Sequence, residues 1–108
     1  GARGAGGRQG GVVVTPRAKR GLTRIVEWWK ESTGAPPALL FAELKEASRR
    51  LGGVPHQGTR FAIVRGRAVF RVLLRESQVH LYYRVDDDAI RVLTIWSTAR
   101  KQAPRFGR

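Results

Sequence analysis

The chain has 108 residues, which is enough for one hydrophobic core and therefore for a single domain. Its 21 Lys and Arg against 8 Asp and Glu give a formal net charge of +13, which favours an anionic partner such as nucleic acid, a ribosome, an anionic membrane surface or an acidic protein. The chain has no cysteine and only two histidines, so disulfides and thiolate chemistry are excluded, and no metal ion or cofactor is expected.

The start of the chain is rich in Gly and Arg and contains no large apolar side chain. Such a segment buries too little apolar surface to offset the conformational entropy lost when a chain becomes ordered. We therefore expect residues 1–11 to be a disordered tail and residues 12–106 to form the domain. Arg3 and Arg8 could contact RNA from this tail, although a tail without a role is the simpler interpretation. No signal peptide and no apolar run near the ~20 residues of a membrane span are visible, so we expect a cytoplasmic protein.

Residues 12–14, all valine, predict a short strand, and an amphipathic helix is expected directly after it. Thr15 and Pro16 supply an N-cap and a first helical residue, and the helix is expected to run to about Thr33 and to stop at Gly34. The apolar residues of this helix recur at helical spacing: Leu22, Ile25, Val26 and Trp29.

A second helix is predicted after the prolines at positions 36 and 37, and it ends at the glycine pair 52–53. The link between the two helices is so short that we expect an antiparallel helical hairpin. The apolar stripe of the second helix consists of Leu40, Leu44, Ala47 and Leu51.

Three runs rich in β-branched and aromatic residues follow, at residues 69–75, 79–85 and 90–97, and two polar four-residue loops separate them. They predict an antiparallel meander, to which a shorter apolar run at residues 61–64 would add a fourth strand. The element order β-α-α-β-β-β defines an α+β fold in which the hairpin covers the apolar sheet face and the first strand pairs at an edge.

A single register of the meander separates apolar from basic side chains. If Leu74 faces Val79 and Val85 faces Ile90, one face is almost wholly apolar. That face carries Phe70, Val72, Leu74, Val79, Leu81, Tyr83, Val85, Ile90, Val92, Thr94 and Trp96. The opposite face, our candidate working surface, carries Arg71, Leu73, Arg75, His80, Tyr82, Arg84, Arg91, Leu93, Ile95 and Ser97. Arg84 is then opposite Arg91, and like charges so placed predict an anionic partner.

Basic residues concentrate in the sheet half and the C-terminal tail, interleaved with aromatic groups. This pattern favours phosphate contacts and base stacking, or an acidic protein surface. The alternative is a solvated strand face whose arginines only deter aggregation. The residues predicted to bind the target are Arg71, Arg75, His80, Tyr82, Arg84, Arg91, Arg100, Lys101 and Arg105.

Residues 79–86 (VHLYYRVD), followed by residues 90–96 and by Ser-Thr-Ala-Arg at 97–100, resemble the RelE/ParE superfamily of bacterial toxins. Residues 14–18 at the start of the first helix, the Trp pair at 28–29, and Pro55 with Gly58 support the resemblance, which spans about residues 12–106. It implies the toxin of a type II toxin-antitoxin module, of the kind linked to plasmid stabilization, held inactive in a hetero-oligomer with its cognate antitoxin. RelE-like members cut mRNA on the ribosome, whereas ParE-like members inhibit DNA gyrase without known nuclease activity.

The resemblance also marks candidate catalytic residues. His80 stands where the family has an arginine, Arg100 matches the arginine after the last strand, and Phe106 falls at the C-terminal tyrosine, where it has no proton to give. His80, Arg71 and Arg100 would be the catalytic set of a metal-independent endoribonuclease. A lone strand histidine is, however, more often a packed or solvated side chain.

The ending at residues 96–100 is closer to ParE-type chains, although Ser97 stands where they often have histidine. We therefore expect a ParE-like toxin that acts by binding its target and not as an enzyme. The alternatives are a RelE-like ribosome-dependent mRNA endoribonuclease and a non-toxic nucleic-acid-binding module. Trp28 lies off the main helical stripe, so it is expected to anchor an amphipathic antitoxin segment, unless it simply widens the core.

Overall fold

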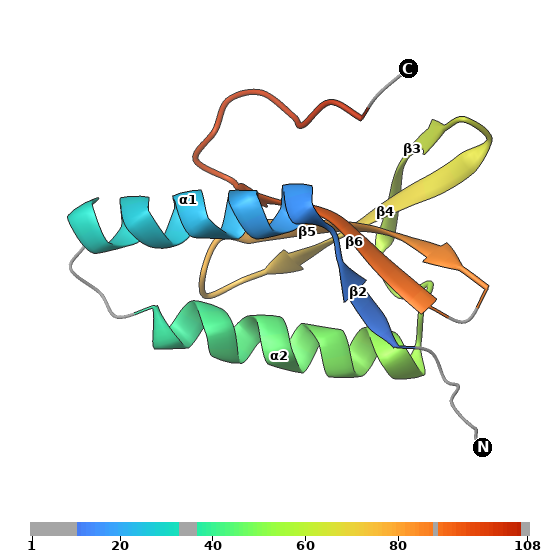
Figure 1. The fold of residues 1–108 in the computed structure, drawn as a ribbon, viewed down its shortest axis with the longest axis horizontal. Helices are drawn as coiled ribbons and strands as arrows, with labels where there is room; N and C mark the ends of the chain where they lie inside the picture. The colour runs from blue at the N-terminus through green and yellow to red at the C-terminus, as the bar shows by residue number, and fades with distance from the viewer. Residues whose placement is uncertain (1–10, 33–36, 88, 107–108) are drawn as a thin grey trace.

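The computed structural model describes residues 11–32, 37–87 and 89–106. Figure 1 shows the order of its elements, which confirms the α+β class and the predicted β-α-α-β-β-β sequence. Nearly all of the predicted tail, including Arg3 and Arg8, and residues 33–36 between the helices lie outside the described residues. The elements are β2 (Val12–Val14), α1 (Pro16–Ser32), α2 (Ala38–Gly53), β3 (Thr59–Val64), β4 (Arg67–Leu74), β5 (Val79–Asp86) and β6 (Ala89–Ser97).

Helix α1 begins as predicted, with Thr15 as its N-cap. The Thr15 Oγ1 atom accepts a hydrogen bond from the backbone amide of Ala18 at 3.2 Å and donates one to the Val92 carbonyl at 2.8 Å. The cap residue therefore ties the start of the helix to strand β6. Helix α2 is tied to the sheet in a similar way, because the Glu43 carboxylate accepts hydrogen bonds from the backbone amides of Glu76 and Ser77 at 3.0 and 2.7 Å.

The five strands form one sheet in the order β2-β6-β5-β4-β3. The predicted fourth strand of the meander exists, and the predicted edge pairing of the first strand is confirmed, since β2 pairs with β6 in parallel. The hairpin between β3 and β4 turns at Arg65 and Gly66, both with positive φ (54° and 80°) as the two-residue hairpin turns require. Strand β2 reaches only to Val92 of β6, so within the described part of the chain no strand pairs with the second half of β6 on that side.

The predicted register holds throughout β4–β5 and in the first part of β5–β6, and it is wrong only in the second part of β5–β6. Leu74 pairs with Val79, and Val85 pairs with Ile90, as expected. A β-bulge then intervenes, because Tyr83 pairs with Val92 whereas Tyr82 pairs with Thr94. Leu93 is the extra residue, and every later side chain of β6 changes faces.

The bulge corrects the predicted positions at the end of β6. Ile95, expected on the outer face, lies in the core and is 4% exposed. Trp96, expected in the apolar row, instead pairs with His80 on the outer face. Thr94 was the only polar residue in the predicted apolar row, and this mismatch marks the place where the strand shifts register.

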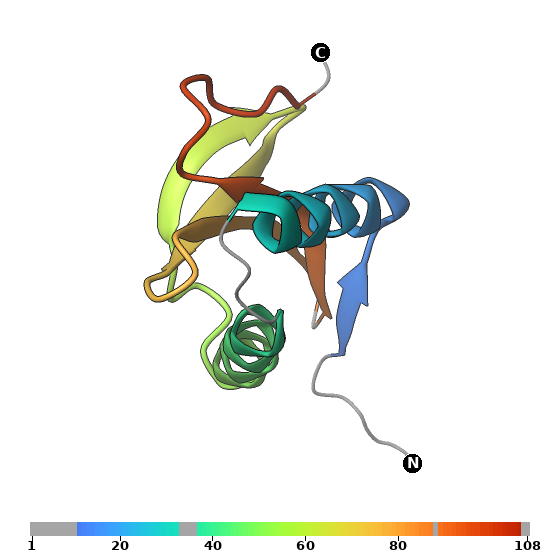
Figure 2. The ribbon, with the colours of Figure 1, turned by 90° about the vertical axis from the view of Figure 1, so that its left-hand side faces the viewer.

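The core lies between the sheet and the two helices, which run antiparallel (Figures 1 and 2). Both predicted helical stripes are confirmed, since their residues belong to the core cluster or pack against it. Trp28 is 51% exposed and does not widen the core. Among the described residues, no helix is long and apolar enough to cross a membrane. The core cluster comprises Ala18, Ile25, Leu40, Ala47, Leu51, Leu74, Val79, Leu81, Tyr83, Ile90, Val92 and Ile95.

Candidate functional site

The centre of the outer sheet face is covered by aromatic rings. Tyr82 is only 1% exposed, because Phe61 of β3 and Phe106 of the C-terminal tail lie over it with ring centroids 4.9 and 5.6 Å away. Phe61 and Phe106 also contact each other, at 6.2 Å. Tyr82 therefore points to the predicted face but is not an accessible side chain there.

Arg71 and His80 flank this aromatic cluster and lie close to each other. The Arg71 guanidinium is 5.3 Å from the Phe61 ring centroid, and its Nη1 is 3.4 Å from the Tyr82 hydroxyl, a long hydrogen bond. Partial burial and then the positive charge of Arg71 lower the pKa of His80 from its usual value of 6.5. His80 is therefore a neutral imidazole at pH 7. It lies 5.9 Å from the Tyr82 ring, and no tyrosine hydroxyl stands at Phe106 to complete an acid-base pair.

The tail after β6 is held against α1 and β6 by specific contacts. The Trp96 indole donates a hydrogen bond to the Gln102 carbonyl at 2.7 Å, and the Arg100 guanidinium stacks 3.8 Å from the Trp96 ring centroid. Arg17 of α1 donates to the Arg105 carbonyl and lies 5.0 Å from the Phe106 ring. Phe106 is thus a packing residue that closes the outer face.

Arg84 and Arg91 are opposed across β5 and β6 as predicted, but the chain itself provides their anion. The Asp86 carboxylate accepts hydrogen bonds from Arg84 Nε and Arg91 Nε, both at 3.0 Å, and from Arg67 at 2.7 Å. Burial opposes ionisation of Asp86, yet the hydrogen bonds from Arg91 and Arg84 and the charges around them hold its pKa below the usual value. The prediction of an anionic partner at this pair is therefore corrected, because Asp86 of the same chain is the anion.

The predicted target-binding residues lie in several groups on the surface. Arg71, His80 and Tyr82 lie at the aromatic cluster, and Arg84 and Arg91 lie at Asp86. Arg75 is exposed near the turn between β4 and β5. Lys101 and Arg105 are exposed on the tail, and Arg100 lies over Trp96. Among the described residues, no group of three or more His, Asp or Glu could hold a metal ion.

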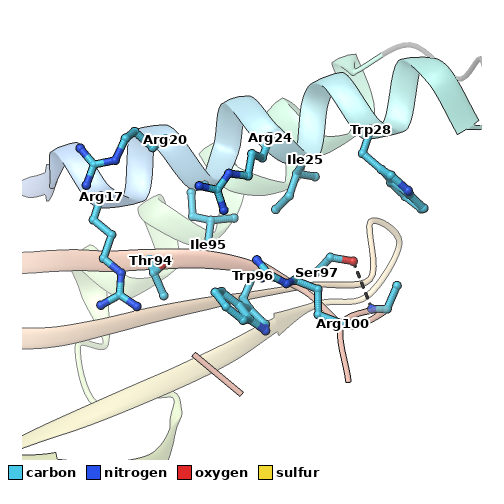
Figure 3. Close-up of a pocket in the computed structure, with 12 residues that line it drawn as sticks. Arg17, Arg20, Arg24, Ile25, Trp28, Thr94, Ile95, Trp96, Ser97 and Arg100 are labelled. Atoms are coloured by element: carbon cyan, nitrogen blue, oxygen red, sulfur yellow. Dashed lines mark hydrogen bonds between the residues drawn. The ribbon is translucent and has the colours of Figure 1, made fainter. Parts of the chain in front are cut away.

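A groove of about 660 Å³ lies between α1 and the second half of β6, and we call it the arginine groove (Figure 3). Its lining includes Arg17, Arg20 and Arg24 of α1 and Arg100 of the tail, and no Asp or Glu among the described residues. The three α1 arginines were not predicted from the sequence. Positions 17, 20, 24 and 28 are separated by three and four residues, which places them on one helix face ending in Trp28.

No family model and no curated protein matches the sequence. Among solved structures, a chain of the chromosomal ParDE TA system from P. aeruginosa has a similar fold, with a TM-score of 0.64 and 25% sequence identity. The match covers 82% of this chain and 96% of that one. The chain is ParE-like. The resemblance predicted from the sequence is therefore confirmed, and it supports a ParE-like toxin of a toxin-antitoxin system.

In this ParE-like chain, the residues predicted for RNA cleavage lie along the His80 end of the outer sheet face. Arg71 and His80 are neighbours beside Tyr82, and Arg100 is stacked on Trp96, the cross-strand partner of His80. The Phe106 ring packs over Tyr82. The arginine groove, on the α1 side of β6, adds the exposed Arg20 and Arg24 to the cationic surface of the protein.

Proposed function

We propose that this ParE-like protein is the toxin of a type II toxin-antitoxin module, which inhibits growth by binding its target and not by catalysis. The observation that carries the proposal is the similarity to the ParDE TA system chain, which extends over 82% of this chain. By resemblance, the target is DNA gyrase. The toxin acts in the cytoplasm, and a cognate antitoxin neutralises it in a hetero-oligomer.

The chemistry of the outer face supports binding over cleavage. An RNase of this kind needs a base, a cation at the phosphate and an acid for the leaving oxygen. His80 and Arg71 could supply the first two, but Tyr82 is 1% exposed and Phe106 has no hydroxyl. A toxin that works by shape and charge needs none of these groups.

The exposed side chain of Trp28 supports an antitoxin contact on α1. At 51% exposure it presents a large apolar surface beside a row of arginines. An amphipathic segment with acidic residues would complement both features, and tryptophan is a frequent hot spot of protein interfaces.

The proposal is tested by expressing the chain in cells and measuring growth, plasmid supercoiling and transcript ends together. Growth arrest with altered supercoiling and intact transcripts is the expected result. Codon-positioned transcript breaks with normal supercoiling would instead establish the RelE-like endoribonuclease. In that case His80→Ala with Arg100→Ala should abolish the breaks, because these residues with Arg71 are the candidate catalytic set.

Normal growth on unrestrained expression would contradict the toxin proposal and favour a non-toxic nucleic-acid-binding module. Co-expression of an acidic partner encoded beside the gene supplies the antitoxin control. If that partner does not restore growth and does not bind the chain, the proposed neutralisation is wrong.

A further inference from the structure

Two of the four arginines of the arginine groove, Arg20 and Arg24, are available to a ligand. Arg20 and Arg24 are exposed, and neither makes an ion pair or side-chain hydrogen bond with another residue in the described part of the chain. The arginines at Asp86 differ, because a carboxylate already satisfies them. Planar guanidinium groups without a partner are suited to phosphate, which they can bind with two parallel hydrogen bonds.

An aromatic platform stands at the end of this arginine row. Trp28 is 51% exposed, and Figure 3 shows its indole on the side of α1 that faces β6, together with the side chains of Arg17 and Arg24. The other indole in the groove, Trp96, is already stacked by Arg100 at 3.8 Å. Trp28 is therefore the ring that can take a base by stacking.

A mostly buried threonine also lines this groove. Thr94 is 3% exposed, and its side chain has no hydrogen-bond partner among the described residues. The β-bulge turned Thr94 out of the core and toward the groove. Its hydroxyl is not among the fully buried polar atoms that lack a partner, so it can bond to water or to a ligand from the groove.

We propose that the arginine groove binds a nucleotide unit, with its phosphate on Arg20 and Arg24 and its base on Trp28. The combination of unpaired guanidinium groups with one exposed indole matches a ligand that is anionic at one end and aromatic at the other. A volume of about 660 Å³ falls within the range of small-ligand sites. An acidic peptide without apolar side chains would use the arginines but would leave Trp28 without a partner.

The test measures binding of the purified full chain to a labelled single-stranded oligonucleotide of about six nucleotides, near physiological salt. An abasic strand with the same number of phosphates is measured beside it. We expect the base-bearing strand to bind about fivefold tighter or more, and Trp28→Ala to remove this preference. Equal binding of both strands, with no effect of Trp28→Ala, would overturn the base-stacking site.

Two arginine pairs then separate a defined site from diffuse attraction by a chain of charge +13. Arg20→Ala with Arg24→Ala should weaken binding about tenfold and reduce the slope of log K against log salt by about 1.4 units, as expected for two phosphate contacts on a single strand. Arg49→Ala with Arg50→Ala removes the same charge from exposed positions on α2 and should change binding by no more than about twofold. An equal loss in both pairs would overturn the proposal.

Two competitors identify the source of the ligand. Displacement of the strand by a mononucleotide indicates a site for free nucleotide, whereas displacement only by longer strands indicates a single-stranded nucleic acid. If a poly-glutamate peptide binds in the same place and nucleotides do not, the groove accepts an acidic protein segment and the proposal is wrong. These measurements use purified protein, so they do not depend on whether the chain arrests growth.

Discussion

Gly21 of α1 lies directly against the backbone of Ile95 in β6. A Cβ atom built on Gly21 would stand only 2.8 Å from the Ile95 carbonyl oxygen, a separation that real Cβ atoms do not show. The helix can approach the strand this closely because glycine has no side chain. Both residues also line the arginine groove.

Replacing Gly21 with alanine should therefore destabilise the fold. Alanine favours helix formation over glycine by about 1 kcal/mol, but the clash is with backbone that cannot rotate away, so we expect a net loss of about 1–3 kcal/mol. Urea unfolding measures the change. Gly52→Ala is the matched control, because Gly52 lies in α2 with no atom within 4 Å of its Cβ position, and it should gain about 0.5–1 kcal/mol. Stabilisation by both substitutions would show that α1 does not pack on β6 as described.

Much of this fold was predictable because its signals are local. The N-cap at Thr15, the helical stripes and the pairing of Leu74 with Val79 follow from spacing along the chain. The bulge at Leu93 was not predicted, because a one-residue insertion depends on how Tyr82 and Thr94 pack across the sheet. Only the polar Thr94 in an apolar row hinted at it.

The candidate site was less predictable than the fold. Strand alternation places a side chain on a face but does not say what covers that face, so the burial of Tyr82 beneath Phe61 and Phe106 was not visible. Asp86 was assigned to a polar loop, although it is the acceptor for Arg84 and Arg91. The arginine row on α1 could be found by helical spacing, but its position beside β6 depends on tertiary packing.

The two adjacent tyrosines of β5 should respond differently to loss of their hydroxyls. The Tyr83 hydroxyl accepts a hydrogen bond from the Gly58 amide at 2.9 Å, and burial raises the pKa of Tyr83, so the group stays protonated near neutral pH. Tyr83→Phe leaves that amide without its partner and should cost about 1 kcal/mol. Tyr82→Phe loses only a 3.4 Å contact with Arg71, which can turn to water, and should cost less than about 0.5 kcal/mol. Chemical denaturation of both variants compares them, and a larger loss for Tyr82→Phe would contradict the described contacts.

Asp86 should make stability depend on pH in the acid range. Its pKa is lower in the folded protein than in the unfolded chain, so its contribution is complete above the unfolded value near 3.8 and is lost as pH falls through the folded value. At pH 7, Asp86→Asn should destabilise the fold by about 1 kcal/mol, because it also leaves Arg84 opposite Arg91 without their carboxylate.

The check on Asp86 is a set of urea unfolding curves for the natural chain and the variant at several pH values. The difference in the free energy of unfolding should shrink as pH falls below about 4, where both chains lack the carboxylate charge. Added salt should shrink it as well, because the cluster is partly exposed. A difference that is independent of pH would indicate a packing effect and not an ionic one.

Trp28 should contribute strongly to the affinity for an antitoxin and little to the stability of the fold. Because the side chain is 51% exposed and outside the core, Trp28→Ala should leave the unfolding midpoint nearly unchanged. If it anchors the antitoxin, the affinity of the purified pair should fall about tenfold or more. Ile63→Ala is the matched control, because Ile63 is 61% exposed on β3, at the far edge of the sheet from β6 and α1. The affinity is measured by calorimetry on a folded variant. Unchanged affinity in Trp28→Ala would show that the antitoxin binds another surface, and the proposed role of Trp28 in nucleotide binding would then stand alone.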